Sequence, residues 1–251
     1  MVKFLIHIVA VMFLISSQCS HSQQVILRTA AQEDTAPKFI KRFNHTNGMC
    51  IDLFHEIEKE DPSFKIIGTE NWAPALRIYE YIKSGQIDIA CGITDADNYQ
   101  NIVIKPAVFT FQYKLIARKE DAPLFHSIED IQRLTDNKTI LAVWGWVGKE
   151  SYLARLNALK IDDGAPSLES NIKKLKAGRG RFMYYRDPGI SNILQQFGLE
   201  EQYVALPFVI AEKPAYIVMK PNTPIQLRIR LEKVVQRLND NMILKKIMAN
   251  Y

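Results

Sequence analysis

The chain has 251 residues, of which 47% are hydrophobic, 24% charged and 10% aromatic. This composition is typical of a globular protein and excludes a disordered, collagen-like or coiled-coil chain. A net charge of +5 over this length is too small to indicate a nucleic-acid-binding protein, and three cysteines are too few for a disulfide scaffold.

The first residues have the pattern of a secretory signal peptide. A positive start precedes an apolar run over residues 4–15, and small or polar residues follow it. The run is shorter than the ~20 residues that a membrane-spanning helix needs. Small residues at Ser20 and Ser22 favour cleavage after Ser22, so we expect a signal peptide over 1–22 and a protein exported to the periplasm. Cleavage after Cys19 and an uncleaved anchor are the alternatives.

The next segments alternate between strands and helices. Apolar periodicity predicts strands at 25–31, 64–67 and 87–93, a polar loop at 32–48, and helices at 51–60 and 74–84. Pro62 ends the first helix, and Gly85 closes the second. This alternation implies parallel strands with helices across their faces.

A second α/β run follows. We expect extended segments at 106–118 and 202–219, strands at 139–144 and 181–186, and helices at 128–134, 149–159, 168–177, after Pro188, 225–238 and 242–248. Two α/β blocks without a flexible linker predict two lobes joined by extended crossings near 115–119 and 204–212. The expected divisions are lobe 1 over 23–117, lobe 2 over 118–205, and a return to lobe 1 with its C-terminal helices over 206–251. A cleft between such lobes is the expected ligand site.

Several segments resemble the family 3 extracellular solute-binding proteins. They are Gly48–Leu53 (GMCIDL), Trp72, Ser84–Gly92 (SGQIDIACG) and the Gly92–Thr94 turn. The resemblance implies an α/β, two-lobed type II periplasmic-binding-protein fold, in which each lobe is a mostly parallel sheet flanked by helices. It further implies a monomeric, non-enzymatic receptor that binds a small polar or aromatic solute and delivers it to an ABC permease in the inner membrane. No metal or organic cofactor is implied.

One position departs from the family pattern. Amino-acid receptors of this family carry an Arg after the Gly-x-Thr turn, and that Arg pairs with the carboxylate of the ligand. Tyr99 stands at that position here, and no Arg or Lys occurs between 95 and 104. Without a cationic partner a buried carboxylate loses ~1.5–3 kcal/mol. Either another cation replaces the Arg, with Arg77 one candidate, or the ligand is not an ordinary α-amino acid.

The family's second anchor is an Asp that faces the ligand ammonium, and Asp187 matches it. Neutralisation by Arg186 and capping of the helix after Pro188 are the alternatives. Tyr185, in the same strand, joins the predicted site.

The other predicted binding residues lie where strands end, which is where ligands bind in parallel sheets. The structural alternatives are a place in the lobe core for Trp72 and Trp144, and ordinary turn hydrogen bonds for Asp34 and Thr35. The groups are Asp34 and Thr35; Trp72; Gly92, Ile93 and Thr94; and Trp144, Gly145, Trp146 and Val147.

Three questions remain open from the sequence. Cys50 and Cys91 form either a disulfide, which export permits, or two buried thiols, and we take the thiols as the default. Some cyclohexadienyl dehydratases share this fold, and such an enzyme would need a general acid, for which Glu33, Asp34 and Glu169 are the candidates. A ligand sensor for a membrane partner is the third alternative.

Overall fold

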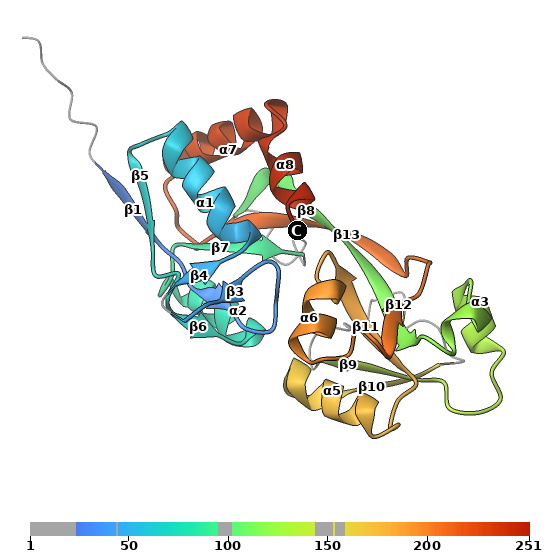
Figure 1. Ribbon diagram of the computed structural model, residues 1–251. Helices are drawn as coiled ribbons and strands as arrows, with labels where there is room; N and C mark the ends of the chain where they lie inside the picture. The colour runs from blue at the N-terminus through green and yellow to red at the C-terminus, as the bar shows by residue number, and fades with distance from the viewer. Residues whose placement is uncertain (1–23, 44, 95–101, 144–152, 154–158) are drawn as a thin grey trace, which may run out of the picture.

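The computed structural model describes residues 24–43, 45–94, 102–143, 153 and 159–251. The chain forms two lobes joined by long strands (Figure 1). Among these residues, no helix combines the length and apolar character that crossing a bilayer requires. The predicted signal peptide at 1–22 lies outside the described residues.

Lobe 1 holds both ends of the described chain (Figure 1). Its elements are β1 (Val25–Arg28), β2 (Ala31–Gln32), β3 (Ile40–Lys41), β4 (Thr46–Asn47), α1 (Met49–Glu60), β5 (Phe64–Ile67), β6 (Trp72–Ala73), α2 (Ala75–Ser84), β7 (Ile89–Ile93), α7 (Ile225–Asp240) and α8 (Ile243–Ala249). Strands β1 and β5 pair in parallel, as do β2 and β6.

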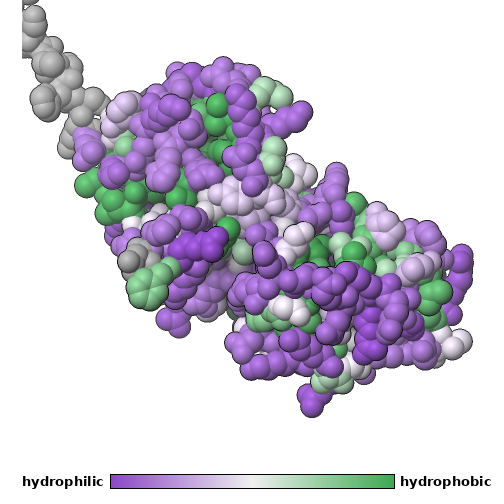
Figure 2. All heavy atoms as spheres, in the orientation of Figure 1, coloured by the Kyte–Doolittle hydropathy of each residue, from purple (hydrophilic) through white to green (hydrophobic). Residues whose placement is uncertain are grey.

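Lobe 2 is built from the middle of the chain. Its elements are a 3₁₀ turn (Ala122–Leu124), α3 (Ile128–Gln132), β9 (Thr139–Val143), β10 (Lys160–Ala165), α5 (Leu168–Lys176), β11 (Phe182–Asp187), α6 (Ile190–Gln196) and β12 (Tyr203–Ala205). Strand β9 pairs in parallel with β10 and β11. Polar residues cover most of the visible face of both lobes (Figure 2).

Two strands connect the lobes: β8 (Val103–Arg118) and β13 (Ala211–Met219). They pair antiparallel with each other, and β8 also pairs with β11 of lobe 2 while β13 pairs with β7 of lobe 1. The described sheet order is therefore β10-β9-β11-β8-β13-β7, with β12 paired to β8. This continuous sheet holds the two lobes in register at the hinge and carries one apolar core along both.

The predicted helices and strands mostly occur where the apolar pattern places them. The helix after Pro74 ends at Gly85, whose φ of 74° is left-handed, and Ser127 forms a capping box with Asp130. The predicted helix at 149–159 lies almost wholly outside the described residues. The predicted lobe boundaries fall at the end of β8 and between β12 and β13.

Three local predictions were wrong. The loop expected at 32–48 contains the short β3–β4 hairpin, and the segment after 160, for which no strand was predicted, forms β10. Strand β10 lacks a regular alternation of buried and exposed residues, because three of its six residues are half-buried and only Ala165 is buried. The first predicted strand ends at Arg28, and the chain resumes as β2. The extended segment predicted at 202–219 contains the two strands β12 and β13.

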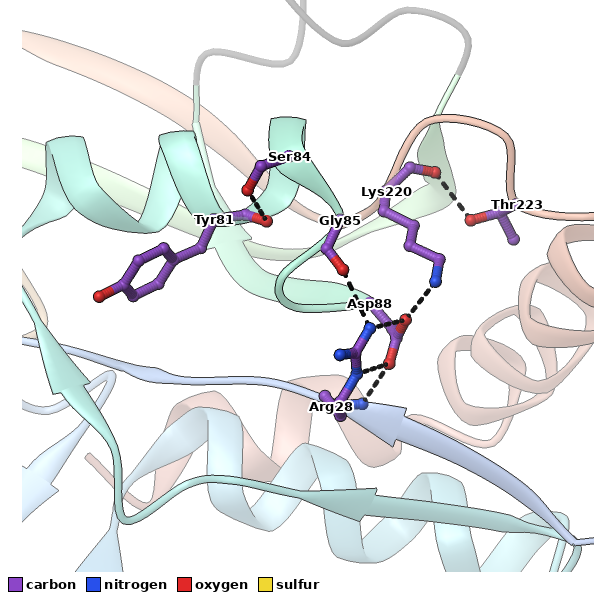
Figure 3. Close-up of polar contacts among 7 residues, drawn as sticks. All are labelled: Arg28, Tyr81, Ser84, Gly85, Asp88, Lys220 and Thr223. Atoms are coloured by element: carbon purple, nitrogen blue, oxygen red, sulfur yellow. Dashed lines mark hydrogen bonds and ion pairs between the residues drawn. The ribbon is translucent and has the colours of Figure 1, made fainter.

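Asp88 of the SGQIDIACG segment ties three elements of lobe 1 together (Figure 3). Its carboxylate accepts hydrogen bonds from the backbone N, Nε and Nη2 of Arg28, at 2.9, 2.8 and 3.0 Å, and lies 2.6 Å from Nζ of Lys220. Burial by itself raises the pKa of Asp88, but these hydrogen bonds outweigh it and hold the pKa well below the usual range. The Asp of this motif is therefore a structural residue, which joins β1 to the start of β7 and to the end of β13.

We expect Asp88→Asn to lower the free energy of unfolding near pH 7 by about 2–3 kcal/mol, because charge-assisted hydrogen bonds are lost. A lowered folded-state pKa contributes stability that is complete above the unfolded pKa of about 4 and is lost as the pH falls through the folded value. Urea unfolding from neutral to acid pH should therefore show a smaller acid loss in the variant. Asp240→Asn, at an exposed position on α7, is the control. Equal stability of the two variants would contradict this role.

Candidate functional site

The loop that follows β2 in lobe 1 touches lobe 2 directly. The hydroxyl of Tyr185, on β11, donates to the backbone oxygens of Asp34 and Ala36 at 3.2 and 3.4 Å. Burial raises the pKa of Tyr185 to about 12, so the hydroxyl keeps the proton that it donates. A Cβ on Gly189, at the start of α6, would lie 2.6 Å from the Ala36 oxygen. The lobes are thus in close contact at this loop.

Asp34 makes the second contact between the lobes. Its Oδ2 accepts a hydrogen bond of 3.0 Å from the backbone N of Leu168, the first residue of α5. A carboxylate at a helix N-terminus satisfies an unpaired N–H and interacts favourably with the helix dipole. The φ of Asp34 is 56°, a conformation that Asp tolerates better than most residues. Asp34, which the sequence predicts to contact ligand, thus forms a hydrogen bond between lobe 1 and lobe 2.

Lys38 ends the same loop and points inward. The residue is 2% exposed, and its Nζ donates to Oε1 of Gln32 and, at 3.3 Å, to the backbone oxygen of Gly92. Gln32 ends β2 and Gly92 lies near the end of β7, so the ammonium sits where two strands of lobe 1 end. Burial, and next the charge of Arg186, hold the pKa of Lys38 well below its usual range.

Because Gly92 has no side chain, there is room beside it for the side chain of Lys38. A Cβ at this position would lie 2.4 Å from Cδ of Lys38, and the φ of Gly92 is 70°, which favours glycine. The glycine of the Gly-x-Thr turn therefore accommodates a lysine stem in this chain. The backbone oxygen of Gly92 accepts a hydrogen bond from Lys38, and contact of Gly92 with a ligand stays a prediction.

Arg186 places a second positive charge at the interface, from lobe 2. The residue is 6% exposed, and its guanidinium carbon lies 5.3 and 5.6 Å from the ring centroids of Phe111 and Tyr185. Stacking on aromatic faces is a favourable environment for guanidinium. Arg186 and Lys38 thus come from opposite lobes, and each is buried.

Asp187 is neutralised by a residue that the sequence did not indicate. Nζ of Lys114, on β8, lies 2.8 Å from its Oδ2, and the two side chains are 20% and 38% exposed. The suggested neutralisation by Arg186 and the capping of α6 were wrong, because Lys114 is the ion-pair partner and the N-cap of α6 is Gly189 without a side-chain bond. Facing a ligand ammonium remains a prediction.

The structure describes the surroundings of some of the other predicted residues, and the rest lie outside the described residues. Thr35 is buried and donates to the Gln32 oxygen, which is an ordinary turn bond, and Ile93 packs in the core of lobe 1. Thr94 is half-buried at the end of β7. Trp72 packs edge-on against Phe39 beside the core. The predictions at Tyr99, Trp144, Gly145, Trp146 and Val147 fall outside the described residues.

Arg77, one candidate for a replacement cation, lies exposed on α2, as a residue on a solvated helix face does. The buried Lys38 was missed from the sequence because a lysine in a polar loop usually faces water. Within the described ranges, no cluster of three or more His, Cys, Asp or Glu side chains is suited to a metal ion.

A disulfide supports the segment that carries Lys38. Cys50 and Cys91 are bonded, with their Cα atoms 6.0 Å apart, so the thiol pair taken as the default was wrong. The backbone N of Cys50 donates to the oxygen of Lys38, and Cys91 precedes Gly92. The bond therefore links the two backbone segments between which the lysine lies.

No protein-family model and no curated protein matches this sequence. Solved structures do match. One is the amino acid ABC transporter substrate-binding protein AbpA from Streptococcus pneumoniae, bound to L-arginine, at 19% identity, with 90% of this chain and 93% of that chain covered and a TM-score of 0.70. The chain has the fold of type II periplasmic binding proteins.

Two further structures with this type II fold are informative. The probable amino-acid ABC transporter extracellular-binding protein ytmK from Bacillus subtilis matches at 14% identity, over 91% of this chain and 98% of that one, with a TM-score of 0.72. An ancestral amino acid-binding protein, AncCDT-1, described as a precursor of cyclohexadienyl dehydratase, matches at 18% identity, over 90% and 95%, with a TM-score of 0.67.

The contact of Asp34 with α5 predicts a variant with weakened closure. Asp34→Gly removes the carboxylate without straining a left-handed backbone position, so the fold should be retained. A charge at a helix N-terminus is worth about 0.3–1 kcal/mol, and more when partly buried, so ligand affinity should fall about twofold to tenfold, mainly through faster release. Calorimetry and stopped-flow dissociation measure this. Glu33→Ala, beside it in the loop, is the control, and equal affinities would contradict the role of Asp34.

The disulfide predicts a stability difference. Replacing Cys50 and Cys91 together by Ala should lower the free energy of unfolding by about 2–4 kcal/mol, because the 41-residue separation leaves a long loop unclosed in the unfolded chain. Urea unfolding of the variant and of the oxidised protein measures the difference. Thiol titration of unfolded, unreduced protein made as residues 23–251 should find no free cysteine; two free thiols would contradict the bond.

Proposed function

We propose that this chain is an exported receptor that binds a small solute between its two lobes and presents the closed form to a membrane ABC permease. The contact of the Asp34–Lys38 loop with lobe 2 is the observation that carries this proposal. Hydrogen bonds from Tyr185 and from the α5 N-terminus reach this loop only when the lobes meet. Hinge closure over a ligand uses such contacts, because they stabilise the closed conformation relative to the open one.

The residues at this interface support binding more than catalysis. They are buried, charged or aromatic, and they come from the ends of strands in both lobes, where ligands of α/β proteins bind. The related structures described above carry the names of amino acid-binding proteins, which supports a small polar solute and a transporter partner. Export to the periplasm, action as a monomer and absence of a cofactor stay predictions.

The dehydratase alternative has less support. Such an enzyme needs a carboxylic acid that holds a proton near neutral pH. Glu169 is 63% exposed and pairs with Lys173 at 2.7 Å, and this partner lowers its pKa. Asp34 is engaged with the N-terminus of α5. Neither side chain is therefore arranged as a general acid. A sensor for a membrane partner would use the same closure, and only a partner distinguishes it from a transport receptor.

A thermal-shift screen of the exported protein tests this proposal. The panel contains amino acids, organic acids, amines, neutral amides and prephenate-like compounds. A solute at 100 times its Kd adds about 2.7 kcal/mol to stability, which a melting experiment detects. We expect at least one solute to raise Tm and to be recovered unchanged. A solute that is converted during incubation would favour the dehydratase, and no response to any class would contradict a receptor.

A further inference from the structure

Gly189 lets lobe 1 approach the backbone of lobe 2 closely. This residue is the N-cap of α6, a helix on the side of lobe 2 that faces lobe 1 (Figure 1). A Cβ at this position would lie 2.6 Å from the backbone oxygen of Ala36 and 3.1 Å from Cδ of Pro37, both in the loop that follows β2 of lobe 1. Real Cβ atoms essentially never have contacts under 3.0 Å, and a backbone oxygen cannot rotate away. A side chain at position 189 would therefore hold the two lobes apart.

Tyr185 lies beside Gly189 and binds the same segment of lobe 1. Its ring is fully buried in the apolar core of lobe 2, so lobe 2 itself fixes its position. Its hydroxyl donates to the backbone oxygens of Asp34 and Ala36 at 3.2 and 3.4 Å. These distances are near the upper limit for a hydrogen bond, so both bonds would be lost if the lobes lay about half an ångström further apart.

The same segment of lobe 1 also caps the N-terminus of α5. Ser167, the N-cap of this helix, uses its side chain to accept from the backbone N of Ser170. The backbone N of Leu168 has no acceptor inside α5, since the N–H groups of a first helical turn lack intrahelical partners. Asp34 supplies that acceptor from lobe 1, at 3.0 Å. The contacts at Gly189, Tyr185 and Leu168 therefore all join atoms of the chain itself across the interface.

From these contacts we infer that the lobes dock on each other without a solute, and that the bare Cα of Gly189 sets how closely they approach. This inference goes beyond the proposed function, because docking uses only atoms of the chain. A solute that prefers the docked conformation binds more tightly when part of the protein has already adopted it, and raises the docked fraction further. Gly189 is thus a positioning residue, which acts on solute binding through the conformation of the lobes.

The backbone N–H of Leu168 reports on this docking in the protein alone. Because its acceptor comes from the other lobe, its hydrogen exchange measures how often Asp34 covers it. The experiment is amide exchange of the solute-free protein, made as residues 23–251 and resolved at Leu168 by NMR. We expect exchange at Leu168 to be at least about twofold slower in the original protein than in Asp34→Gly, which lacks the acceptor.

Gly189→Ala should raise the exchange rate at Leu168 to that of Asp34→Gly, because the added Cβ prevents docking. Gly198→Ala is the matched control at the other end of α6. Both glycines have a positive φ, 139° and 61°, but no atom of the described chain lies within 4 Å of a Cβ at Gly198. The control therefore introduces a strained alanine without a contact to lobe 1, and Leu168 should exchange as it does in the original protein.

Tyr185→Phe tests the same contact without adding an atom. The variant keeps the buried ring and removes the donor to the loop of lobe 1, so exchange at Leu168 should be intermediate. In the Gly189→Ala background the substitution should have no further effect, because the added Cβ has already separated the hydroxyl from its acceptors. Residues that act through one contact are non-additive in this way.

Three results would overturn the inference. The first is exchange at Leu168 that is as fast in the original protein as in Asp34→Gly. The second is slow exchange in Gly189→Ala, once a melting curve has shown that this variant is folded. The third is exchange that Tyr185→Phe leaves unchanged, and this result decides the question even where Gly189→Ala does not fold.

Failure of this inference is distinguishable from failure of the receptor proposal. If a compound of the thermal-shift panel raises Tm while Leu168 exchanges freely without it, the receptor survives and the inference fails. If Leu168 is protected in the solute-free protein and Gly189→Ala removes the protection, but no compound binds, the inference stands and the receptor proposal fails.

Discussion

The contact between the Asp34–Lys38 loop of lobe 1 and lobe 2 is the interaction on which the closed arrangement of the lobes depends. The hydroxyl of Tyr185 donates to the backbone oxygens of Asp34 and Ala36, and the carboxylate of Asp34 accepts from the backbone N of Leu168 at the start of α5. These hydrogen bonds join the two lobes, so they favour the closed conformation over the open one. A ligand shifts such an equilibrium only by its difference in affinity for the two states.

The fold positions this loop and Tyr185 with rigid elements. Lys38 lies between the backbone near Cys50 and the backbone of Gly92, and the disulfide joins these segments. Asp88, further along the same motif, fixes the first strand of lobe 1 against β7 through Arg28 (Figure 3). On the other side, Tyr185 stands on β11, which pairs with β8, and β8 is continuous with lobe 1. The hinge strands therefore carry both halves of the site in a defined register.

Much of this architecture could be predicted from the sequence because it follows from periodicity and from one motif. Helix α2 between Pro74 and Gly85 is an example, since both of its ends have local chemical signals. The site could be predicted only in part. Asp34 and Tyr185 were found from their places at strand ends, but Lys38 was not, because its burial is produced by Gly92, a residue distant in the sequence. The partner of Asp187 was missed for the same reason, since strand pairing brings Lys114 to it.

The most direct test of the account is the distance between the lobes in solution. Spin labels at Lys59 on α1 and Lys173 on α5, both highly exposed, report on this distance by pulsed electron resonance. We predict that a solute that raises the Tm shifts the distance distribution to shorter values, and that Asp34→Gly reduces this shift. A distribution that is the same with and without such a solute, or a shift that Asp34→Gly leaves intact, would contradict closure through the Asp34–Lys38 loop.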